Sequence, residues 1–478
     1  MFLILIVIIS TFLRLYKLDS IPGEMWGDVN EHYKMAKSIN DGHFFLSYVF
    51  GGDGPLFSYL VTLISKIFGL SFWSIKFTTA IVGILLVIAT YYLAQELFKN
   101  KRISLISTFL IAISFWSVTF SRQAKPHILV PLLVVLAFYY LLKKKYIFAG
   151  IFFGLGMYSQ AGFWGAFLFS FYNPLSFLTA SIVLLPFILN LNQSFSLSGS
   201  FYTEKLGINS GFNFTQAILT VFQNFCKNIL SFNIRGDNAF RHTISGQPHL
   251  DFISGVFFLI GFLLIIIMVI KKRNIKLLLY FVLPFFIIQI PSIMDIKNPL
   301  SIPNMGRMIG VIPFVYISVA YGLNWLMSFF ENKVVKNLLL VFILAVIFFI
   351  NFNDYFYKYT KNLPNENTAF GKIISEEVNK SYENIDTILM VGCCWGQWGQ
   401  PEPDSVRFLL NNKKIIKFMN MGIDNYNCDL IPMGSRVLII TAPEVNNMAG
   451  IGKCFKIKKE YLIKKNNYSI AKFIDVER

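Results

Sequence analysis

The sequence predicts a mainly α-helical protein that crosses a membrane many times and carries a small α/β domain at its C-terminal end. Of its 478 residues, 55% are hydrophobic and 14% are charged, whereas soluble domains average about 25% charged residues. Several apolar runs reach the ~20 residues that a helix needs to span a bilayer. The composition changes after about residue 353. We therefore expect a transmembrane domain over residues 1–352 and a separate domain over residues 353–478.

Basic residues predict the orientation of the chain, because basic clusters stay in the cytoplasm in most membrane proteins. Four such clusters lie at the ends of apolar segments: Lys99-Asn100-Lys101-Arg102, Lys143-Lys144-Lys145, Lys271-Lys272-Arg273 and Lys333 with Lys336. If all four lie on the cytoplasmic side of the plasma membrane, the C-terminal domain and four loops fall outside the cytosol. These loops are residues 17–72, 121–127, 192–251 and 291–307. The same distribution accounts for the net charge of +17, so the lipid bilayer is the expected partner and nucleic acid is not.

We expect about eleven membrane-spanning helices. The first, residues 2–13, is interpreted as a retained helix, because it lacks the basic start and the clear small-residue cleavage site of a signal peptide. Residues 146–191 must cross an odd number of times. Three short or tilted crossings are favoured over one crossing with a re-entrant piece, which would give about nine spans. The other spans are expected at residues 73–98, 103–120, 128–142, 252–270, 277–290, 308–327 and 338–350.

Other segments predict structure outside the spans. Residues 55–70 suggest an interfacial helix, and residues 29–40 a short polar helix with Asp28 as its N-cap. In the C-terminal domain we expect helices at 369–382 and 405–411, strands at 387–391 and 436–441, and a hairpin formed by 460–464 and 469–474. The four cysteines of this domain are compatible with either a disulfide or free thiols: Cys393, Cys394, Cys428 and Cys454.

The first outer loop gathers acids that could take a proton from a hydroxyl at the membrane face. They are Asp19, Glu24, Asp28, Glu31, Asp41 and Asp53. For any one of them, an ordinary acid in a solvated loop is the favoured interpretation. Asp28 stands out, because it follows Trp26-Gly27 and begins a predicted helix.

Cationic side chains gather at the outer ends of predicted spans. Arg122, Lys125 and His127 lie between two spans, and Arg307 begins another. Guanidinium and ammonium groups suit phosphate oxygens, although interfacial snorkelling explains the same positions.

The long outer loop contains three further residues of metal-ligand type, His242, His249 and Asp251. Their spacing matches no known zinc site. A loop ordered by glycine and proline turns is the favoured interpretation, and no metal site is predicted there.

The order and spacing of several stretches resemble the polytopic GT-C glycosyltransferases, in the broad group of protein O-mannosyltransferases and the lipid A aminoarabinose transferase. The resemblance covers most of residues 12–330. It rests on Arg14-Leu15, Trp26-Gly27-Asp28, Ala36, Gly54-Pro55-Leu56-Phe57-Ser58-Tyr59-Leu60, Ser121-Arg122-Gln123-Ala124-Lys125-Pro126-His127, the run from Ala149 to Tyr158, the block from Gly246 to Gly261, and the segment from Arg307 to Pro313.

This resemblance implies an inverting transferase that moves a sugar from a polyprenyl-phosphate donor to a hydroxyl of a protein, lipid or glycan. Asp28 corresponds to the catalytic acid of the first outer loop. Family members commonly have Asp-Glu there, whereas this chain has Asp28-Val29, and Glu31 could substitute from one turn along. Many members have an Asp in the second outer loop, where this chain has His127.

Further roles follow from the same resemblance and from the charges. Substrate binding is expected of Asp53, Arg122, Lys125, His127 and Arg307. No cofactor is required by the chemistry alone, and a divalent cation stays open. The sequence identifies neither the sugar nor the acceptor.

Two other functions fit a polytopic chain. A transporter or flippase of lipid-linked sugars would carry charged residues within its spans. Here the predicted spans are nearly free of charge and the acids concentrate in loops, which favours the enzyme. A non-catalytic scaffold is the third interpretation, with Val29 as the sign of lost activity.

The charge pattern predicts that a cysteine introduced into residues 353–478 reacts with a membrane-impermeant thiol reagent in intact cells. A cysteine introduced into the cluster at 143–145 is the matched control, and it should react only after lysis. Protection of the C-terminal cysteine until lysis would contradict the predicted orientation.

Overall fold

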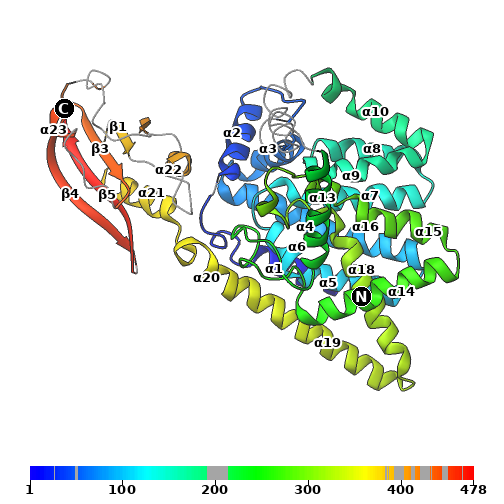
Figure 1. Ribbon diagram of the computed structural model, residues 1–478. Coiled ribbons are helices and arrows are strands. Elements are labelled where there is room, and N and C mark those ends of the chain that lie inside the picture. Colours follow the sequence, from blue (N-terminus) through cyan, green and yellow to red (C-terminus); the bar gives the residue numbers. More distant parts are fainter. Residues whose placement is uncertain are drawn as a thin grey trace. The chain divides into compact units, whose positions relative to one another are not determined.

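The computed structural model describes residues 1–25, 27–48, 52–190, 214–382, 385, 387–391, 403–410, 415–419, 431, 433–443, 451–465 and 467–478. Trp26, Cys393, Cys394 and Cys428 lie outside this part of the chain. The described residues form two compact units (Figure 1). The first comprises Met1–Leu18 and His32–Asn362, and the second comprises Asp19–Glu31 and Leu363–Arg478. The predicted fold class is confirmed, since apolar helices dominate the first unit and a small sheet lies in the second.

The first unit is built from apolar helices. Its main helices are α1 (Phe2–Leu15), α3 (Leu56–Phe68), α4 (Phe72–Phe98), α5 (Lys101–Ile113), α6 (Phe115–Phe120), α7 (Leu129–Leu142), α8 (Tyr146–Met157), α10 (Pro174–Leu189), α13 (Phe214–Leu230), α14 (Phe252–Lys271), α18 (Ile312–Leu326) and α19 (Lys333–Asn353). Shorter turns are η1 (Pro126–Ile128), η6 (Pro299–Ser301), η7 (Ile309–Val311), η8 (Met327–Phe329), α15 (Ile275–Leu277), η5 (Leu278–Val282), α16 (Leu283–Ile287), α17 (Ile290–Ile293), η9 (Asp354–Tyr359) and α20 (Thr360–Asn362). The helix α2 (Asp28–Asn40) begins in the second unit and continues into the first.

Among the described residues, five helical stretches are long and apolar enough to cross a membrane. They are Phe72–Phe98, Phe252–Lys271, Ile275–Ile293, Ile309–Phe329 and Lys333–Asn362. Six shorter apolar helices accompany them: Phe2–Leu15, Leu56–Phe68, Pro126–Leu142, Tyr146–Met157, Ala161–Tyr172 and Pro174–Leu189. A total of about eleven spans therefore stays a prediction.

Residues 146–190 form three short helical segments. The middle one joins η2 (Ala161–Phe163), α9 (Trp164–Phe167) and η3 (Leu168–Tyr172), and it lies between α8 and α10 in the chain. The helices α8 and α10 pack closely, because Gly154 brings no side chain to their contact. A Cβ on Gly154 would lie 2.6 Å from Cβ of Val183. Such small-residue contacts are typical of helix pairs in membranes.

Two of the basic clusters, and a lysine just after a third, meet at one end of the first unit. Glu96, near the end of α4, pairs with Lys99 and, at 2.9 Å, with Lys143 at the end of α7. Lys276, which follows the cluster after α14, donates to the backbone carbonyl of Glu96 at 2.8 Å. The predicted common side of these clusters agrees with this geometry.

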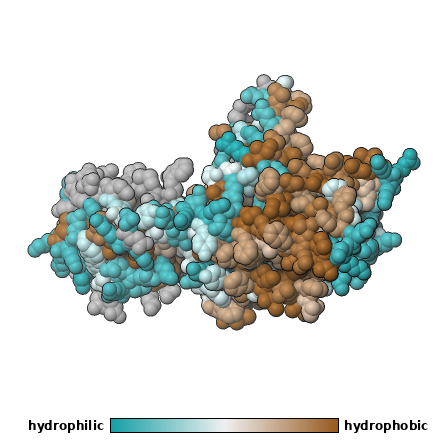
Figure 2. Space-filling model, turned by 90° about the horizontal axis from the view of Figure 1, so that it is seen from below, coloured by the Kyte–Doolittle hydropathy of each residue, from teal (hydrophilic) through white to brown (hydrophobic). Residues whose placement is uncertain are grey.

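The surface of the first unit carries broad apolar areas bordered by polar ones (Figure 2). Large exposed hydrophobic side chains line the surfaces of α1, α10, α14 and α19. Examples are Ile4, Ile8, Leu178, Ile182, Leu259, Leu263, Leu338 and Phe342. Apolar patches of this extent are costly in water and favourable against lipid.

The second unit contains a five-stranded sheet in the order β2-β1-β3-β5-β4. Its strands are β1 (Thr387–Val391), β2 (Ile415–Met419), β3 (Arg436–Thr441), β4 (Lys456–Lys465) and β5 (Tyr468–Glu477). The strand β1 pairs in parallel with β2 and β3, and β5 pairs antiparallel with β3 and β4. The expected strands at 387–391 and 436–441 and the expected hairpin are present. The strand β2 was not predicted.

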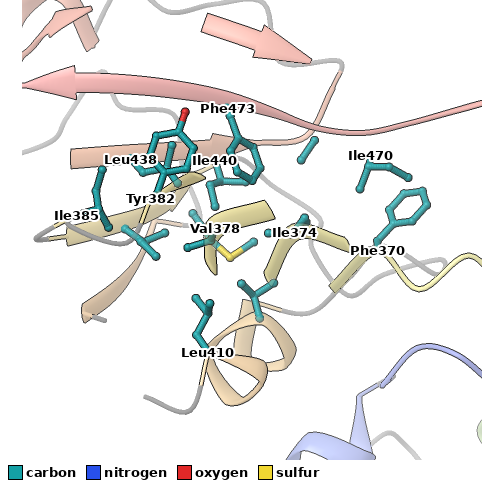
Figure 3. Close-up of a cluster of buried hydrophobic side chains, with 14 residues drawn as sticks. Phe370, Ile374, Val378, Tyr382, Ile385, Leu410, Leu438, Ile440, Ile470 and Phe473 are labelled. Carbon is teal, nitrogen blue, oxygen red and sulfur yellow. The ribbon is translucent and has the colours of Figure 1, made fainter. Parts of the chain in front are cut away.

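Helices complete the second unit. They are η10 (Pro364–Asn367), α21 (Phe370–Ser381), α22 (Pro403–Leu409) and α23 (Ile451–Cys454). Ile374 and Val378 of α21, and Leu410 just after α22, pack on one face of the sheet against Leu438 and Ile440 (Figure 3). Alternate residues of β1 and β3 enter a second core on the opposite face. Cys454 is disulfide-bonded, and its partner lies outside the described residues.

Candidate functional site

The proposed catalytic acids lie in the first turn of α2. Asp28 was predicted as the N-cap, but the helix already begins at Asp28, and Glu31 follows three residues later. Residues three apart share one face of a helix, and both acids are half-buried. Gly27 precedes them with a φ of +47°, a conformation that favours glycine. The positive end of the helix dipole stabilises acids at this position.

One turn further along α2, His32 forms a buried pair with Asp53. Its Nε2 lies 3.2 Å from Oδ2 of Asp53, and its Nδ1 lies 3.4 Å from Oγ of Ser58. The backbone of Asp53 pairs with that of Gln160 as an isolated antiparallel bridge. The structure therefore holds Asp53 from two sides. His32 was not singled out in the sequence, although its position four residues after Asp28 on a polar helix was a usable signal.

The loop between α6 and α7 reaches the same group of residues through His127. Its Nε2 lies 3.0 Å from Nε2 of Gln160, so Gln160 connects His127 with Asp53. The His127 ring also faces those of Phe120 and His242, at centroid distances of 5.4 and 5.9 Å. A Cβ on Gly306 would lie 2.6 Å from Cδ2 of His127, which explains the glycine. Lys125, in the same loop, is buried.

The loop between α13 and α14 contributes a buried His–Asp pair. Nδ1 of His242 lies 2.8 Å from Oδ2 of Asp237. The carboxylate also accepts hydrogen bonds from the backbone N–H groups of Ala239 and Met305. Burial alone would raise the pKa of Asp237, but His242 and the two amides lower it below its ordinary value. This pair orders the loop beside His127.

The other two residues of metal-ligand type in this loop, His249 and Asp251, have partners within the protein. His249 is buried, with its ring 4.9 Å from that of Trp116 and its Nδ1 3.3 Å from Oγ of Ser231. Asp251 caps α14 by accepting from Ser254 N. Within the described ranges, His, Cys, Asp and Glu side chains do not gather in groups of three that could hold a metal ion.

The guanidinium of Arg307 is half-exposed, and neighbouring residues fix its orientation. Its Nη1 pairs with Oδ2 of Asp295, a buried carboxylate that also accepts from Ser301 Oγ at 3.2 Å. Its backbone N–H donates to Oδ1 of Asn304 at 2.9 Å. In the described part of the chain this ion pair uses one of the guanidinium donors. The others suit a phosphate oxygen.

Arg122 has a different environment from the predicted one. Its side chain is fully buried, and Nε donates to Oη of Tyr355 at 2.9 Å. Nη1 donates to the carbonyls of Leu13 and Arg14 at 2.8 and 2.9 Å, and Nη2 donates to that of Lys17 at 3.0 Å. Within the described residues, at least four of the five N–H groups therefore bind to the protein. These bonds hold Arg122 against the C-terminal end of α1, and its expected contact with phosphate stays a prediction.

Comparison with known proteins supports a glycosyltransferase fold. A family model described as dolichyl-phosphate-mannose-protein mannosyltransferase matches residues 53–188. This range begins at Asp53 and includes the second outer loop. An uncharacterized protein from Aquifex aeolicus (strain VF5) is 28% identical over 119 residues, which is 23% of this chain and 24% of that protein. The match thus spans about a quarter of that relative.

Solved structures share the fold over nearly the whole chain. ArnT from Cupriavidus metallidurans, bound to undecaprenyl phosphate, matches with a TM-score of 0.59 at 10% identity, covering 99% of this chain and 97% of that chain. The archaeal oligosaccharyltransferase AglB from Archaeoglobus fulgidus, in complex with an inhibitory peptide and a dolichol-phosphate, matches with a TM-score of 0.53 at 14% identity, covering 92% and 69%. The predicted resemblance to GT-C glycosyltransferases is confirmed, and at these identities the likeness to solved structures establishes the fold.

His249 predicts a pH dependence of stability. Burial lowers its pKa from 6.5 to about 4, so the unfolded chain binds more protons between these values. Its contribution is complete above about pH 6.5 and is lost as the pH falls toward about 4. His249→Gln should flatten the fall of the unfolding temperature between about pH 7 and about pH 5, measured in detergent. His43→Gln, at an exposed position, is the control. An unchanged slope in the His249 variant would contradict this assignment.

Proposed function

We propose that the chain transfers a sugar from a polyprenyl-phosphate donor to a hydroxyl of a protein, lipid or glycan at the outer face of the plasma membrane. The observation that carries the proposal is the acid pair Asp28 and Glu31 at the head of α2, one turn before the buried His32–Asp53 pair. The family match from residue 53 to 188 supports the donor class. So does the fold shared with ArnT bound to undecaprenyl phosphate and AglB bound to a dolichol-phosphate.

The reaction is a single displacement at the anomeric carbon of the sugar. The carboxylate of Asp28 takes the proton of the acceptor hydroxyl, and the oxygen attacks C1 from the face opposite the phosphate. The bond from C1 to the phosphate oxygen breaks, and its electron pair leaves with polyprenyl phosphate. The configuration at C1 is therefore inverted. Asp28 then releases the proton to water.

The departing phosphate gains charge, and a cation that is already oriented lowers the barrier most. Arg307 meets this condition, because Asp295 fixes its guanidinium while leaving donors for the phosphate. Asp53, Lys125 and His127 are proposed to contact the substrates. Glu31 is proposed as the second acid on the same helix face as Asp28.

Buried cations in the first unit do not favour the transporter. Lys76 is fully buried and donates to the carbonyl of Leu18 at 2.5 Å. Arg14 binds the hydroxyls of Ser10 and Ser117, each at 2.8 Å. These cations are bonded to the surrounding protein, whereas charges along a transport pathway would serve the passing substrate. The enzyme remains the preferred function.

Asp28→Asn should lower sugar transfer by about 10²–10⁴-fold, because the amide keeps the size of the side chain but cannot accept the proton. The assay uses membranes with endogenous acceptors and radiolabelled undecaprenyl-phosphate mannose and dolichyl-phosphate mannose. Glu31→Gln should cost activity to a smaller extent. A folded Asp28→Asn protein that transfers at the parental rate would refute Asp28 as the base.

Arg307 and Arg122 should respond differently to removal of the guanidinium. Arg307→Ala should weaken use of the donor by ~10–1000-fold, as expected for a lost charge-assisted contact. Arg122→Ala should instead lower the unfolding temperature, because it leaves the carbonyls of α1 without donors. Donor kinetics and thermal unfolding are measured on both proteins. Parental donor kinetics in the Arg307 variant would assign this residue to interfacial snorkelling.

A further inference from the structure

The segment that carries Asp28 packs with a part of the chain more than three hundred residues away. Residues Asp19–Glu31 form one compact unit with Leu363–Arg478. Among the described residues, Glu24 on the loop and Asn367 and Ser405 in the C-terminal segment form hydrogen bonds between these two stretches. Lys372 also pairs with Asp19 at 3.6 Å.

Glu24 caps the helix α21. Its Oε2 accepts a hydrogen bond from the backbone N–H of Gly371 at 2.7 Å, and its Oε1 accepts from Met25 N at 3.0 Å. Gly371 lies in the first turn of α21, where N–H groups have no partner within the helix. Ala369, at the N-cap, offers no side-chain bond. Glu24 is buried, so the loop supplies the capping carboxylate that the helix itself lacks.

Ser405 holds the loop on both sides of Asp28. This residue of α22 is fully buried. Its Oγ donates to the carbonyl of Met25 at 3.1 Å and accepts from Nδ2 of Asn30 at 3.3 Å. One hydroxyl thus bonds to a residue before Asp28 and to a residue in the same helical turn after it.

Asn367 holds the beginning of the same loop. Its Oδ1 accepts from Gly23 N at 2.7 Å, and its Nδ2 donates to the carbonyl of Ser20 at 2.7 Å. Added to the bonds of Glu24 and Ser405, these contacts satisfy polar groups of the loop at Ser20, Gly23, Met25 and Asn30. The C-terminal segment therefore fixes the loop at several points.

The groups that hold the loop are themselves fixed by a packed core. Phe370, Ile374 and Val378 of α21 belong to one hydrophobic cluster (Figure 3). Val406, the residue next to Ser405, belongs to the same cluster. Such cores are packed as densely as crystals. The bonds to Glu24 and Met25 thus originate from a rigid part of the unit.

We infer that the C-terminal unit positions the catalytic carboxylate, with Ser405 and Glu24 as positioning residues. This inference rests on the proposed function, in which Asp28 is the base. A catalytic group must be held within about 0.5 Å and about 10–20° of its productive geometry. A displacement of about 1 Å can cost about a hundredfold in rate. The short loop obtains this precision from the C-terminal core.

The test compares Ser405→Ala with Ser375→Ala in the full-length protein. Ser375 is a buried serine of the same unit whose Oγ donates within the unit, to the carbonyl of Gly371 at 2.7 Å, and which has no bond to the loop among the described residues. Two quantities are measured: hydrogen exchange of the amides in residues 19–31, and transfer from radiolabelled undecaprenyl-phosphate and dolichyl-phosphate mannose. Ser405→Ala should speed exchange and lower kcat about tenfold with KM for the donor unchanged, while Ser375→Ala should do neither.

Glu24 provides a graded comparison. Glu24→Gln keeps one acceptor oxygen and should retain more activity than Glu24→Ala. Transfer by Ser405→Ala at the Ser375→Ala rate, or unchanged exchange in residues 19–31, would overturn the positioning role alone. A parental protein that transfers sugar from neither probe would instead count against the proposed function and the inference together.

Discussion

The first unit depends on finding hydrogen-bond acceptors for guanidinium groups that are buried in an apolar environment. A buried charge without partners costs several kcal/mol, on the order of the whole net stability of a domain. Arg14 meets this demand through carbonyls of α5 and hydroxyls of Ser10, Ser117 and Ser121. Arg122 meets it through the last carbonyls of α1 and through Tyr355. Together they fix the end of α1, where the loop that leads to Asp28 begins.

The chain that continues from the end of α1 carries both the proposed catalytic acids and the residues proposed to contact the substrates. The loop enters the second unit, where Glu24 and Ser405 hold it, and returns to the first unit within α2. Inside the first unit, a separate chain of contacts joins His32, Asp53, Gln160 and His127. The acids therefore depend on the C-terminal core, and the residues proposed to contact the substrates depend on the apolar helices.

Local patterns in the sequence predicted most of the helices and strands, because hydrophobic periodicity and basic clusters are short-range signals. Asp28 at the head of a helix was predicted for the same reason. The partners of Arg122 were not predicted, because its acceptors are backbone carbonyls of α1, about a hundred residues away. The bond between Ser405 and Met25 could not be predicted either, because 380 residues separate them. Backbone partners at such distances leave no pattern in a single sequence.

The central claim is that Asp28 acts on an acceptor beside a donor phosphate held by Arg307. A structure of the full-length protein with a polyprenyl-phosphate sugar bound tests it most directly. The account predicts the phosphate within about 3 Å of the Arg307 guanidinium, and the Asp28 carboxylate on the opposite side of C1, within hydrogen-bond reach of an incoming hydroxyl. A donor bound with its phosphate away from Arg307, or with C1 facing away from Asp28, would contradict it.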